Sequence, residues 1–359
     1  MVVGILGGGQ LARMLALAGH PLGLKFVTLE LAEDACSAAV SEQIQGAYDD
    51  ETRLLALAKR ADVVTFEFEN IPARSVALLS DKVPCYPPAE ALAVAQDRLN
   101  EKQMFNRLNI ATAPYQAVNS LSELKQAINP LGYPAILKTR RDGYDGKGQA
   151  LLRSEADLEK GWQAVAENPS IVEALIPFDR EVSIIAARSR SGEIACYPLT
   201  ENRHQEGILR TSIVRPNDPL QSLAERYIHK LLNEMNYVGV LALELFQVGD
   251  QLLANECAPR VHNSGHWTQD GAVCCQFENH LRAIYDLPLG STRPTTGHVA
   301  MLNLIGKLPA RQAVLAQPDA HLHLYDKAPR SGRKLGHINL CSADKQCFEE
   351  QLEALQVLL

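Results

Sequence analysis

The sequence lacks the features of a membrane or nucleic-acid-binding protein. No apolar run approaches the ~20 residues that span a bilayer, and there are no repeats or low-complexity tracts. Basic residues do not outnumber acidic ones, and the net charge is -7. We therefore expect no membrane and no nucleic-acid partner, and an anionic ligand would need a local basic cluster.

The sequence also has no C-x-x-C pair among its eight cysteines. The first apolar run, Val2 to Leu6, is short and is broken by Gly7, Gly8 and Gly9, so we expect no leader. These features predict a reduced, cytoplasmic protein. A length of 359 residues with 46% hydrophobic content allows two or three compact units.

The N-terminal segment predicts a strand, a glycine turn and a helix. Val2 to Leu6 has the pattern of a buried strand, and Gln10 to Gly19 has helical periodicity. Glycine amides and a helix N-terminus favour a bound phosphate or carboxylate. The pattern Gly7-x-Gly9 with Glu30 about twenty residues later also fits a dinucleotide site, so an NAD enzyme is an alternative.

The same unit continues to about residue 100. Thr52 to Arg60 is expected to be a helix and Asp62 to Phe66 a strand, with Glu67, Glu69 and Asn70 following that strand. Open α/β sheets bind ligands at the carboxyl ends of their strands. A solvated strand end explains these acidic residues equally well.

A second unit follows a helical pattern from Ala89 to Leu108. A helix capped at Ser122 should end at Gly132, and the strand Pro134 to Lys138 should lead into the glycine-rich loop 142–149. We expect this loop to be a mobile flap whose amides cover phosphates, although a plain hairpin turn would have the same composition.

A predicted hairpin carries two carboxylates. Glu244 lies in the apolar run 239–248 and Glu256 follows the run 251–254. A two-residue turn pairs Glu244 with Asn255, whereas a three-residue loop or a bulge near Asn255 pairs it with Glu256. If the two carboxylates meet, they predict a magnesium site.

The stretch from Asn255 to Ala272 is unusually rich in polar groups and contains Arg260, His262 and a Trp. A strand that delivers such residues to one edge predicts a site. The alternative is a polar loop on a solvated surface, but such loops rarely carry a Trp, and Pro259 and Gly265 indicate a fixed path. The spacing from His262 to His266 suggests zinc, but Asn263 replaces the glutamate of zinc proteases, so we do not expect zinc.

The densest cluster of basic residues lies late in the chain, in the segment 326–334. This segment is either an anion cradle or a solvated turn. His321 and His323 precede it with strand alternation and are expected to form an exposed strand face.

Several motifs together resemble the ATP-grasp ligases and, within them, the N5-carboxyaminoimidazole ribonucleotide synthetase family, nearly end to end. The motifs are Gly8-Gly9-Gln10-Leu11, Gln96-Asp97-Arg98, the loop 143–149, Asn255-Glu256 with the run from Arg260 to Trp267, Tyr325-Asp326-Lys327 and Gly332-Arg333-Lys334.

The resemblance implies ATP- and Mg²⁺-dependent carboxylation of 5-aminoimidazole ribonucleotide by bicarbonate through carboxyphosphate, in a homodimer. It implies an ATP site made of Arg98, Lys138, Gly143, Tyr144, Asp145, Gly146, Lys147, Gly148, Gln149, Glu173, Ala174, Leu175, Ile176, Glu181, His204, Asn255 and Glu256, with magnesium on Glu244 and Glu256. Bicarbonate and the amine would face Arg260, His262, Asn263 and Ser264. The ribonucleotide would contact Gly8, Gly9, Gln10, Leu11, Glu67, Tyr144, Asp145, Lys327, Arg333 and Lys334, with Arg330 as an extension.

The resemblance also implies an α/β fold of the ATP-grasp type. We expect an N-terminal Rossmann-like, doubly wound domain at 1–100, an ATP-grasp domain at 101–290 with a lid at about 114–176, and a small β-rich C-terminal domain at 291–359. Other hypotheses are another ATP-grasp ligase on a ribonucleotide, the NAD-dependent dehydrogenase, and a nucleotide-binding regulatory module without turnover.

Overall fold

The computed structural model describes residues 1–143 and 148–359, and this part of the chain forms three β-sheets with flanking helices. Tyr144, Asp145, Gly146 and Lys147 lie outside the described residues, and so does the predicted flap for which they are central. Within the described ranges, no helix combines the length and apolar character needed to cross a membrane.

The N-terminal sheet is parallel and has helices on both faces. Its strands, in spatial order, are β3 (Glu42–Gln45), β2 (Lys25–Glu30), β1 (Val2–Leu6) and β4 (Val63–Phe66). Its helices are α1 (Gln10–Gly19), η1 (His20–Leu22), α2 (Glu51–Ala58), α3 (Ala73–Ser80) and α4 (Ala89–Ala95).

The alternation of side chains along β1 explains this two-sided packing. Val3 and Ile5 join the core that contains α1 and, from much later in the chain, α10 (Gln276–Ile284). Leu6 packs on the opposite side, in the core formed with α2 and α3. The predicted strand, glycine turn and helix are confirmed, and the glycine loop lies at the carboxyl end of β1.

The helical pattern from Ala89 to Leu108 is interrupted, so the prediction of one helix is wrong. α4 ends at Ala95 and α5 (Arg98–Arg107) begins anew, because the Asp97 side chain accepts hydrogen bonds from the N–H groups of Leu99 and Asn100. This new helix start sets the orientation of Arg98.

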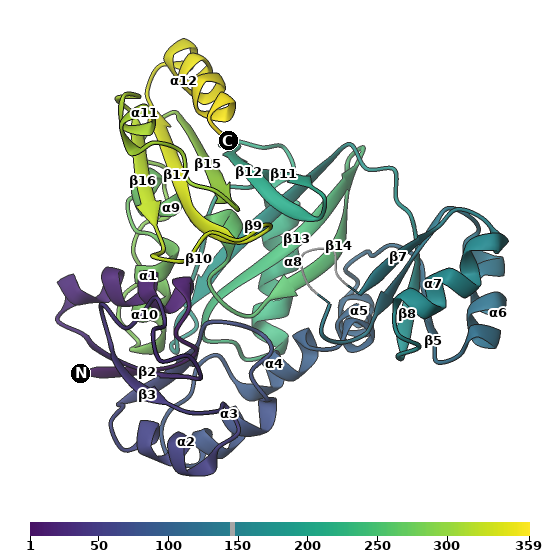
Figure 1. The fold of residues 1–359 in the computed structure, drawn as a ribbon, viewed down its shortest axis with the longest axis horizontal. Helices are drawn as coiled ribbons and strands as arrows, with labels where there is room; N and C mark the ends of the chain where they lie inside the picture. The colour runs from purple at the N-terminus through teal and green to yellow at the C-terminus, as the bar shows by residue number, and fades with distance from the viewer. Residues whose placement is uncertain (144–147) are drawn as a thin grey trace.

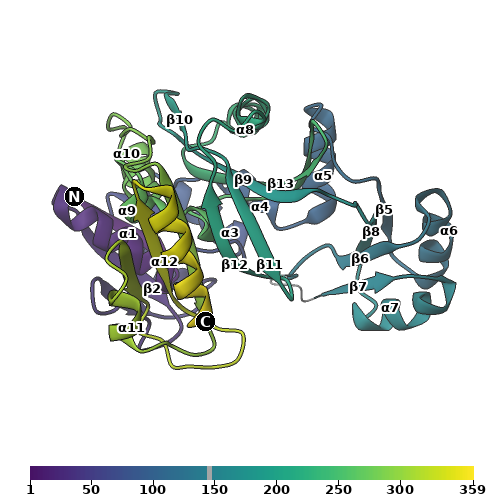
Figure 2. The same ribbon diagram turned by 90° about the horizontal axis from the view of Figure 1, so that it is seen from above.

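A small antiparallel sheet follows, in the order β5 (Tyr115–Val118), β8 (Ser170–Ala174), β6 (Ala135–Thr139) and β7 (Gln149–Leu152). Its helices are α6 (Leu121–Leu131), η2 (Glu155–Asp157) and α7 (Leu158–Ala164). The cap of α6 is Ser120, not Ser122 as predicted, since its hydroxyl accepts from the N–H of Glu123. Figures 1 and 2 show this unit standing apart from the rest of the molecule.

The largest sheet runs β14-β13-β9-β11-β12-β15-β17-β16, with β10 beside β9. Its strands are β9 (Arg180–Arg188), β10 (Ile194–Cys196), β11 (Thr200–Gln205), β12 (Ile208–Val214), β13 (Gly239–Val248), β14 (Gln251–Ala258), β15 (His298–Ile305), β16 (Ala320–Leu324) and β17 (Lys334–Ser342). The remaining helices are α8 (Gln221–Glu234), η3 (Asn263–Gly265), α9 (Thr268–Gly271), α11 (Arg311–Leu315) and α12 (Lys345–Val357). Because β15 pairs with β12, the C-terminal strands extend the central sheet (Figure 1).

Candidate active site

A cavity of about 670 Å³ lies where the three sheets approach one another. Its wall includes most of the residues that the sequence singled out, from strands and loops more than 300 positions apart. These residues are Gln10, Leu11, Glu67, Arg98, Lys138, Gly143, Gln149, Glu173, Ala174, Leu175, Ile176, Glu181, His204, Glu244, Asn255, Glu256, Arg260, His262, Asn263 and Lys334.

Other predicted residues lie outside this wall, as far as the described residues show. They are Gly8, Gly9, Gly148, Ser264, Lys327 and Arg333. Ser264 is fully buried, and its hydroxyl lies 2.9 Å from Nδ1 of His262, so it can act on the cavity through that ring.

The glycine loop holds the protein's own carboxylate. Glu67, at the carboxyl end of β4, accepts hydrogen bonds from the N–H groups of Gly9 and Ala12, the latter at 2.9 Å. Burial raises the pKa of Glu67, while the two N–H groups and the nearby Lys327 oppose the rise. Gly7 has φ +105, and a Cβ there would lie 2.5 Å from Cγ of Glu67, so this close approach requires glycine.

The carboxylate of Glu30 also accepts hydrogen bonds from within the protein. Its Oε2 accepts from the N–H of Gly8 at 2.8 Å and from the hydroxyl of Tyr48 at 2.7 Å, and its Oε1 accepts from the N–H of Leu31. These contacts occupy the carboxylate that a dinucleotide ribose would need. They disfavour the NAD hypothesis.

Two carboxylates meet on the hairpin of β13 and β14. The turn has two residues, because Val248 pairs with Gln251, yet a register shift makes Glu244 pair with Glu256. The predicted alternative of a bulge near Asn255 is therefore confirmed. Burial would raise the pKa of Glu244, but its contact with His262 brings the pKa down to about 2.

The hairpin offers oxygen atoms suited to a hard cation. Glu256 Oε2 lies 2.8 Å from Nη1 of Arg98, and Glu244 Oε1 lies 3.1 Å from Nε2 of His262. Among the described residues, no hydrogen-bond donor reaches the buried Oδ1 of Asn255, which lies between them in sequence. Two carboxylates and a free amide oxygen fit Mg²⁺.

Two ammonium groups, one from the small sheet and one from α5, meet at Glu173 on the cavity wall. Lys138 alternates with the core residues of β6 and so points to the cavity, where its Nζ lies 3.3 Å from Oε2 of Glu173. Lys102 on α5 approaches the same oxygen at 3.1 Å. Burial would raise the pKa of Glu173, but the two ammonium groups lower it, and burial together with Lys102 lowers the pKa of Lys138.

Sequence reasoning assigned no role to Lys102, which is only 1% exposed. The signal that could have found it is its position four residues after Arg98 in α5, which places both side chains on one helix face.

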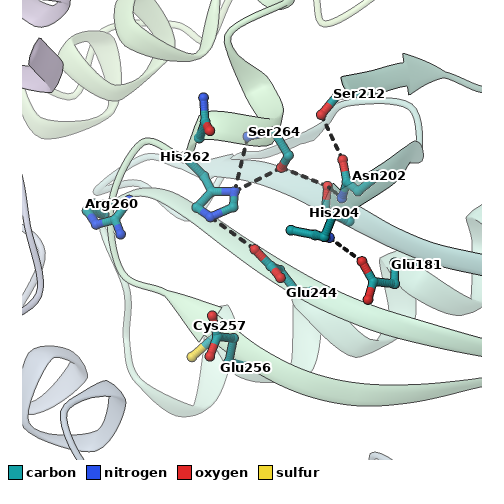
Figure 3. Close-up of polar contacts among 12 residues, drawn as sticks. Glu181, Asn202, His204, Ser212, Glu244, Glu256, Cys257, Arg260, His262 and Ser264 are labelled. Atoms are coloured by element: carbon teal, nitrogen blue, oxygen red, sulfur yellow. Dashed lines mark hydrogen bonds and ion pairs between the residues drawn. The ribbon is translucent and has the colours of Figure 1, made fainter. Parts of the chain in front are cut away.

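Arg260 and the segment after it form one end of the cavity. The guanidinium of Arg260 donates to Glu69, and burial would raise the pKa of Glu69 but the guanidinium lowers it to about 2. Asn263 exchanges hydrogen bonds with Asn303 of β15 at 3.0 and 2.7 Å. His262 contacts both Ser264 and Glu244 (Figure 3).

His204 pairs with Glu181 across β11 and β9 (Figure 3). Burial would lower the pKa of His204, but the hydrogen bond with Glu181 raises it. The pair lies on the cavity wall among the predicted nucleotide residues.

The late basic segment lies beside the glycine loop. Nζ of Lys327 donates to Oε1 of Gln10, and Nη1 of Arg333 donates to the carbonyl of Ala328 at 3.1 Å. Arg330 is exposed. Lys327 therefore joins the C-terminal segment to the first residue of α1.

The expectation of an exposed histidine face on β16 is only partly correct. His321 is exposed, but His323 is half-buried, and both contact Asp270, at 3.6 and 2.7 Å. Asp270 thus binds this strand to α9.

Comparisons with known proteins cover the whole chain. Family profiles match residues 1–96 (ribonucleotide synthetase preATP-grasp domain), 103–277 (ATP-grasp domain) and 299–351 (phosphoribosylaminoimidazole carboxylase C-terminal domain). The chain is 50% identical to the N5-carboxyaminoimidazole ribonucleotide synthase of Pseudomonas aeruginosa over 359 residues, which cover 100% of this chain and 99% of that one.

Solved structures with the same fold include members of the same family. The N5-carboxyaminoimidazole ribonucleotide synthetase of Thermus thermophilus has a TM-score of 0.95 and 50% identity, covering 99% of this chain and 98% of that one. The Aspergillus clavatus enzyme, in complex with ADP and 5-aminoimidazole ribonucleotide, has a TM-score of 0.92 and 29% identity, covering 99% and 98%. The ATP-grasp fold is confirmed, and the dehydrogenase hypothesis is wrong.

Proposed function

Because the chain belongs to the N5-carboxyaminoimidazole ribonucleotide synthase family, we propose that its cavity joins bicarbonate to the exocyclic amine of 5-aminoimidazole ribonucleotide, driven by ATP. The protein is an ATP-dependent ligase of purine biosynthesis. The reaction gives N5-carboxyaminoimidazole ribonucleotide, ADP and phosphate through carboxyphosphate. The observation that carries this proposal is one cavity that combines a cation cluster, a carboxylate pair and the largely buried guanidinium of Arg260.

ATP lies between the small sheet and the central sheet. Lys138 and Arg98 neutralise phosphate oxygens, and Glu173, Ala174, Leu175 and Ile176 hold the nucleotide together with Glu181, His204 and Asn255. We assign the loop 143–149 to the nucleotide as well: Gly143 and Gln149 line the cavity, and residues 144–147 lie outside the described residues. Phosphoryl transfer depends mainly on positioning and charge neutralisation, which these side chains supply.

Glu244, Glu256 and the amide oxygen of Asn255 would hold Mg²⁺. The opposed carboxylates and the unpartnered amide oxygen support this assignment. When bound, the ion supplies charge neutralisation to phosphate oxygens.

The carboxylation step takes place at the end of the cavity beside Arg260, His262, Asn263 and Ser264. The Arg260 side chain is 15% exposed and is held by Glu69, so its fixed guanidinium can hold an anion such as bicarbonate or carboxyphosphate. His262 and Asn263 line the same end of the cavity, and Ser264 acts through His262.

The ribonucleotide contacts the glycine loop and the basic segment. Gly8, Gly9, Gln10, Leu11 and Glu67 form one side of this site. The resemblance also assigns Tyr144 and Asp145 to the ribonucleotide, and these two lie outside the described residues. Lys327, Arg333 and Lys334 form the other side. The bond between Lys327 and Gln10 supports this assignment, because it brings the two segments together.

We also propose a cytoplasmic homodimer whose chain has domains at 1–100, 101–290 (lid about 114–176) and 291–359. All eight cysteines are free, which supports a reducing compartment. Light scattering coupled to gel filtration tests the dimer.

The decisive experiment measures phosphate release from ATP with 5-aminoimidazole ribonucleotide and bicarbonate omitted in turn. We expect release to fall to background without either one. Release that does not depend on the ribonucleotide would refute the proposed reaction.

A further inference from the structure

A chain of buried polar side chains crosses the central sheet behind the cavity. It contains Ser212 on β12, Asn202 on β11 and Ser183 on β9, which are 0%, 5% and 1% exposed, and it ends at Ser264. Ser212 pairs with Asn202, and Ser183 pairs with Glu244 on β13. Asn202 lies two residues from Thr200, the register partner of Ser183, and a side-chain hydrogen bond joins Asn202 to Ser183. A polar row therefore runs from β12 to the register partner of Glu244, and Figure 3 shows its contact between Ser212 and Asn202.

The hydrogen bonds in this row run in one direction. The hydroxyl of Ser212 donates to Oδ1 of Asn202 at 2.8 Å, and the amide of Asn202 donates to Oγ of Ser183 at 2.9 Å. Ser183 donates in turn to Oγ of Ser264 at 2.8 Å. A hydroxyl has one proton, so each serine that accepts from one neighbour donates to the next.

The direction of the row decides where the proton of His262 lies. The hydroxyl of Ser264 accepts from Ser183, so its own proton points to Nδ1 of His262, 2.9 Å away. The N–H of Ser264 also donates to Nδ1, at 3.3 Å. Nδ1 is thus an acceptor, and the ring proton is on Nε2, which faces Oε1 of Glu244 at 3.1 Å.

We propose that Ser212, Asn202 and Ser183 are positioning residues which, through Ser264, hold His262 as the Nε2–H tautomer and so fix the orientation of Glu244. The inference deepens the proposed function and rests on it for the role of Glu244. With its Oε1 held by His262, Glu244 keeps Oε2 for the cation. Asn202 determines the direction, because an amide cannot reverse donor and acceptor without turning over.

The test replaces Asn202 with an isosteric acceptor. In Asn202→Asp the carboxylate accepts from both Ser212 and Ser183, so Ser183 must accept from Ser264 and Ser264 from His262. Nδ1 of His262 then carries a proton. ¹⁵N NMR of the ligand-free protein at one fixed pH distinguishes the two states of Nδ1, and a His262→Asn spectrum assigns the signal.

We expect wild-type His262 to show an unprotonated Nδ1 and Asn202→Asp to show a protonated one. We expect kcat to fall by roughly 10- to 100-fold, as for other residues that orient metal ligands, with a higher Mg²⁺ requirement. The matched control is Asn279→Asp on α10, a fully buried asparagine bonded to Tyr197 and Gly290, which should leave the His262 signal unchanged.

A second variant covers the case in which Asn202→Asp does not fold. Ser212→Ala removes the far donor, lets the amide turn, and should give a mixed Nδ1 signal and a kcat lower by roughly 2- to 10-fold. Its control is Ser75→Ala, another buried serine. A protonated Nδ1 in the wild type overturns the proposal.

A folded Asn202→Asp or Ser212→Ala variant also overturns the proposal if the tautomer of His262 stays the same, or if the tautomer changes and kcat does not. The NMR signal needs no turnover, so failure of this proposal is distinct from failure of the ribonucleotide dependence.

Discussion

Glu244 and Glu256 lie directly opposite each other on β13 and β14, at the point where the register shifts. Each has one cationic or hydrogen-bonding neighbour, Arg98 for Glu256 and His262 for Glu244. Arg98 and His262 each offset part of the charge of one carboxylate, and the remaining carboxylate oxygens are of the kind that bind a hard cation such as Mg²⁺.

We predict that Glu244→Gln and Glu256→Gln each lower kcat by roughly 100-fold, because each removes one anionic ligand from the proposed Mg²⁺ site. ADP release over a Mg²⁺ titration measures the effect, and circular dichroism should show an intact fold. The control is Glu349→Gln, the same change on exposed α12. Wild-type rates in either hairpin variant would refute the metal assignment.

The sequence predicts those parts of the site that depend on local patterns, and it does not predict those that depend on contacts between residues far apart in the chain. The strands β1 and β13 follow from their apolar patterns, but the pairing of Glu244 depended on a bulge that composition does not specify. The break before α5 depends on Asp97, whose carboxylate binds Arg140 from 43 positions away at 2.7 and 2.9 Å. Tertiary partners of this kind leave no periodic signal in the sequence.

Arg333→Ala should raise the KM for the ribonucleotide roughly tenfold, with little change in the KM for ATP. The reason is the loss of a guanidinium that can bind phosphate oxygens bidentately, next to the Lys327–Gln10 contact. Steady-state kinetics with each substrate varied measures both constants. Arg311→Ala, exposed on α11, is the control. If the KM for ATP rises instead, the basic segment belongs to the nucleotide.

The Arg260–Glu69 pair should make stability depend on pH in acid. The pKa of Glu69 is about 2 in the folded state, against roughly 4.3 in unfolded chains. A lowered pKa stabilises the fold above the unfolded value, and this contribution is lost as the pH falls from about 4.3 toward 2.

Because the Glu69 side chain is 33% exposed, solvent screening reduces the effect to about 1 kcal/mol. Urea unfolding of wild type and Glu69→Gln at pH 6 and pH 3 measures it. The difference between the two proteins should shrink at pH 3, and an equal difference at both pH values would contradict the assignment.

Replacing Lys102 should weaken the binding of ATP without lowering the stability of the fold. Lys102 and Lys138 share Oε2 of Glu173, so this buried cluster has two positive charges and one negative charge. Lys102→Met leaves one neutral pair and replaces a buried ammonium by an apolar chain of similar size, so the melting temperature should stay the same or rise. Glu173 then holds Lys138 alone, and the ammonium of Lys138 is less available to a phosphate.

We therefore expect the KM for ATP to increase roughly tenfold in Lys102→Met, while the KM for the ribonucleotide stays unchanged, because Lys138 and Glu173 line the part of the cavity that we propose for the nucleotide. Lys125→Met, a half-exposed lysine on α6 that lies 3.8 Å from Glu159, is the matched control. Thermal unfolding and substrate-variation kinetics on the same preparations measure both effects. A lower melting temperature with an unchanged KM for ATP would mean that Lys102 only stabilises the packing between α5 and the small sheet, and that Lys138 acts on the nucleotide without it.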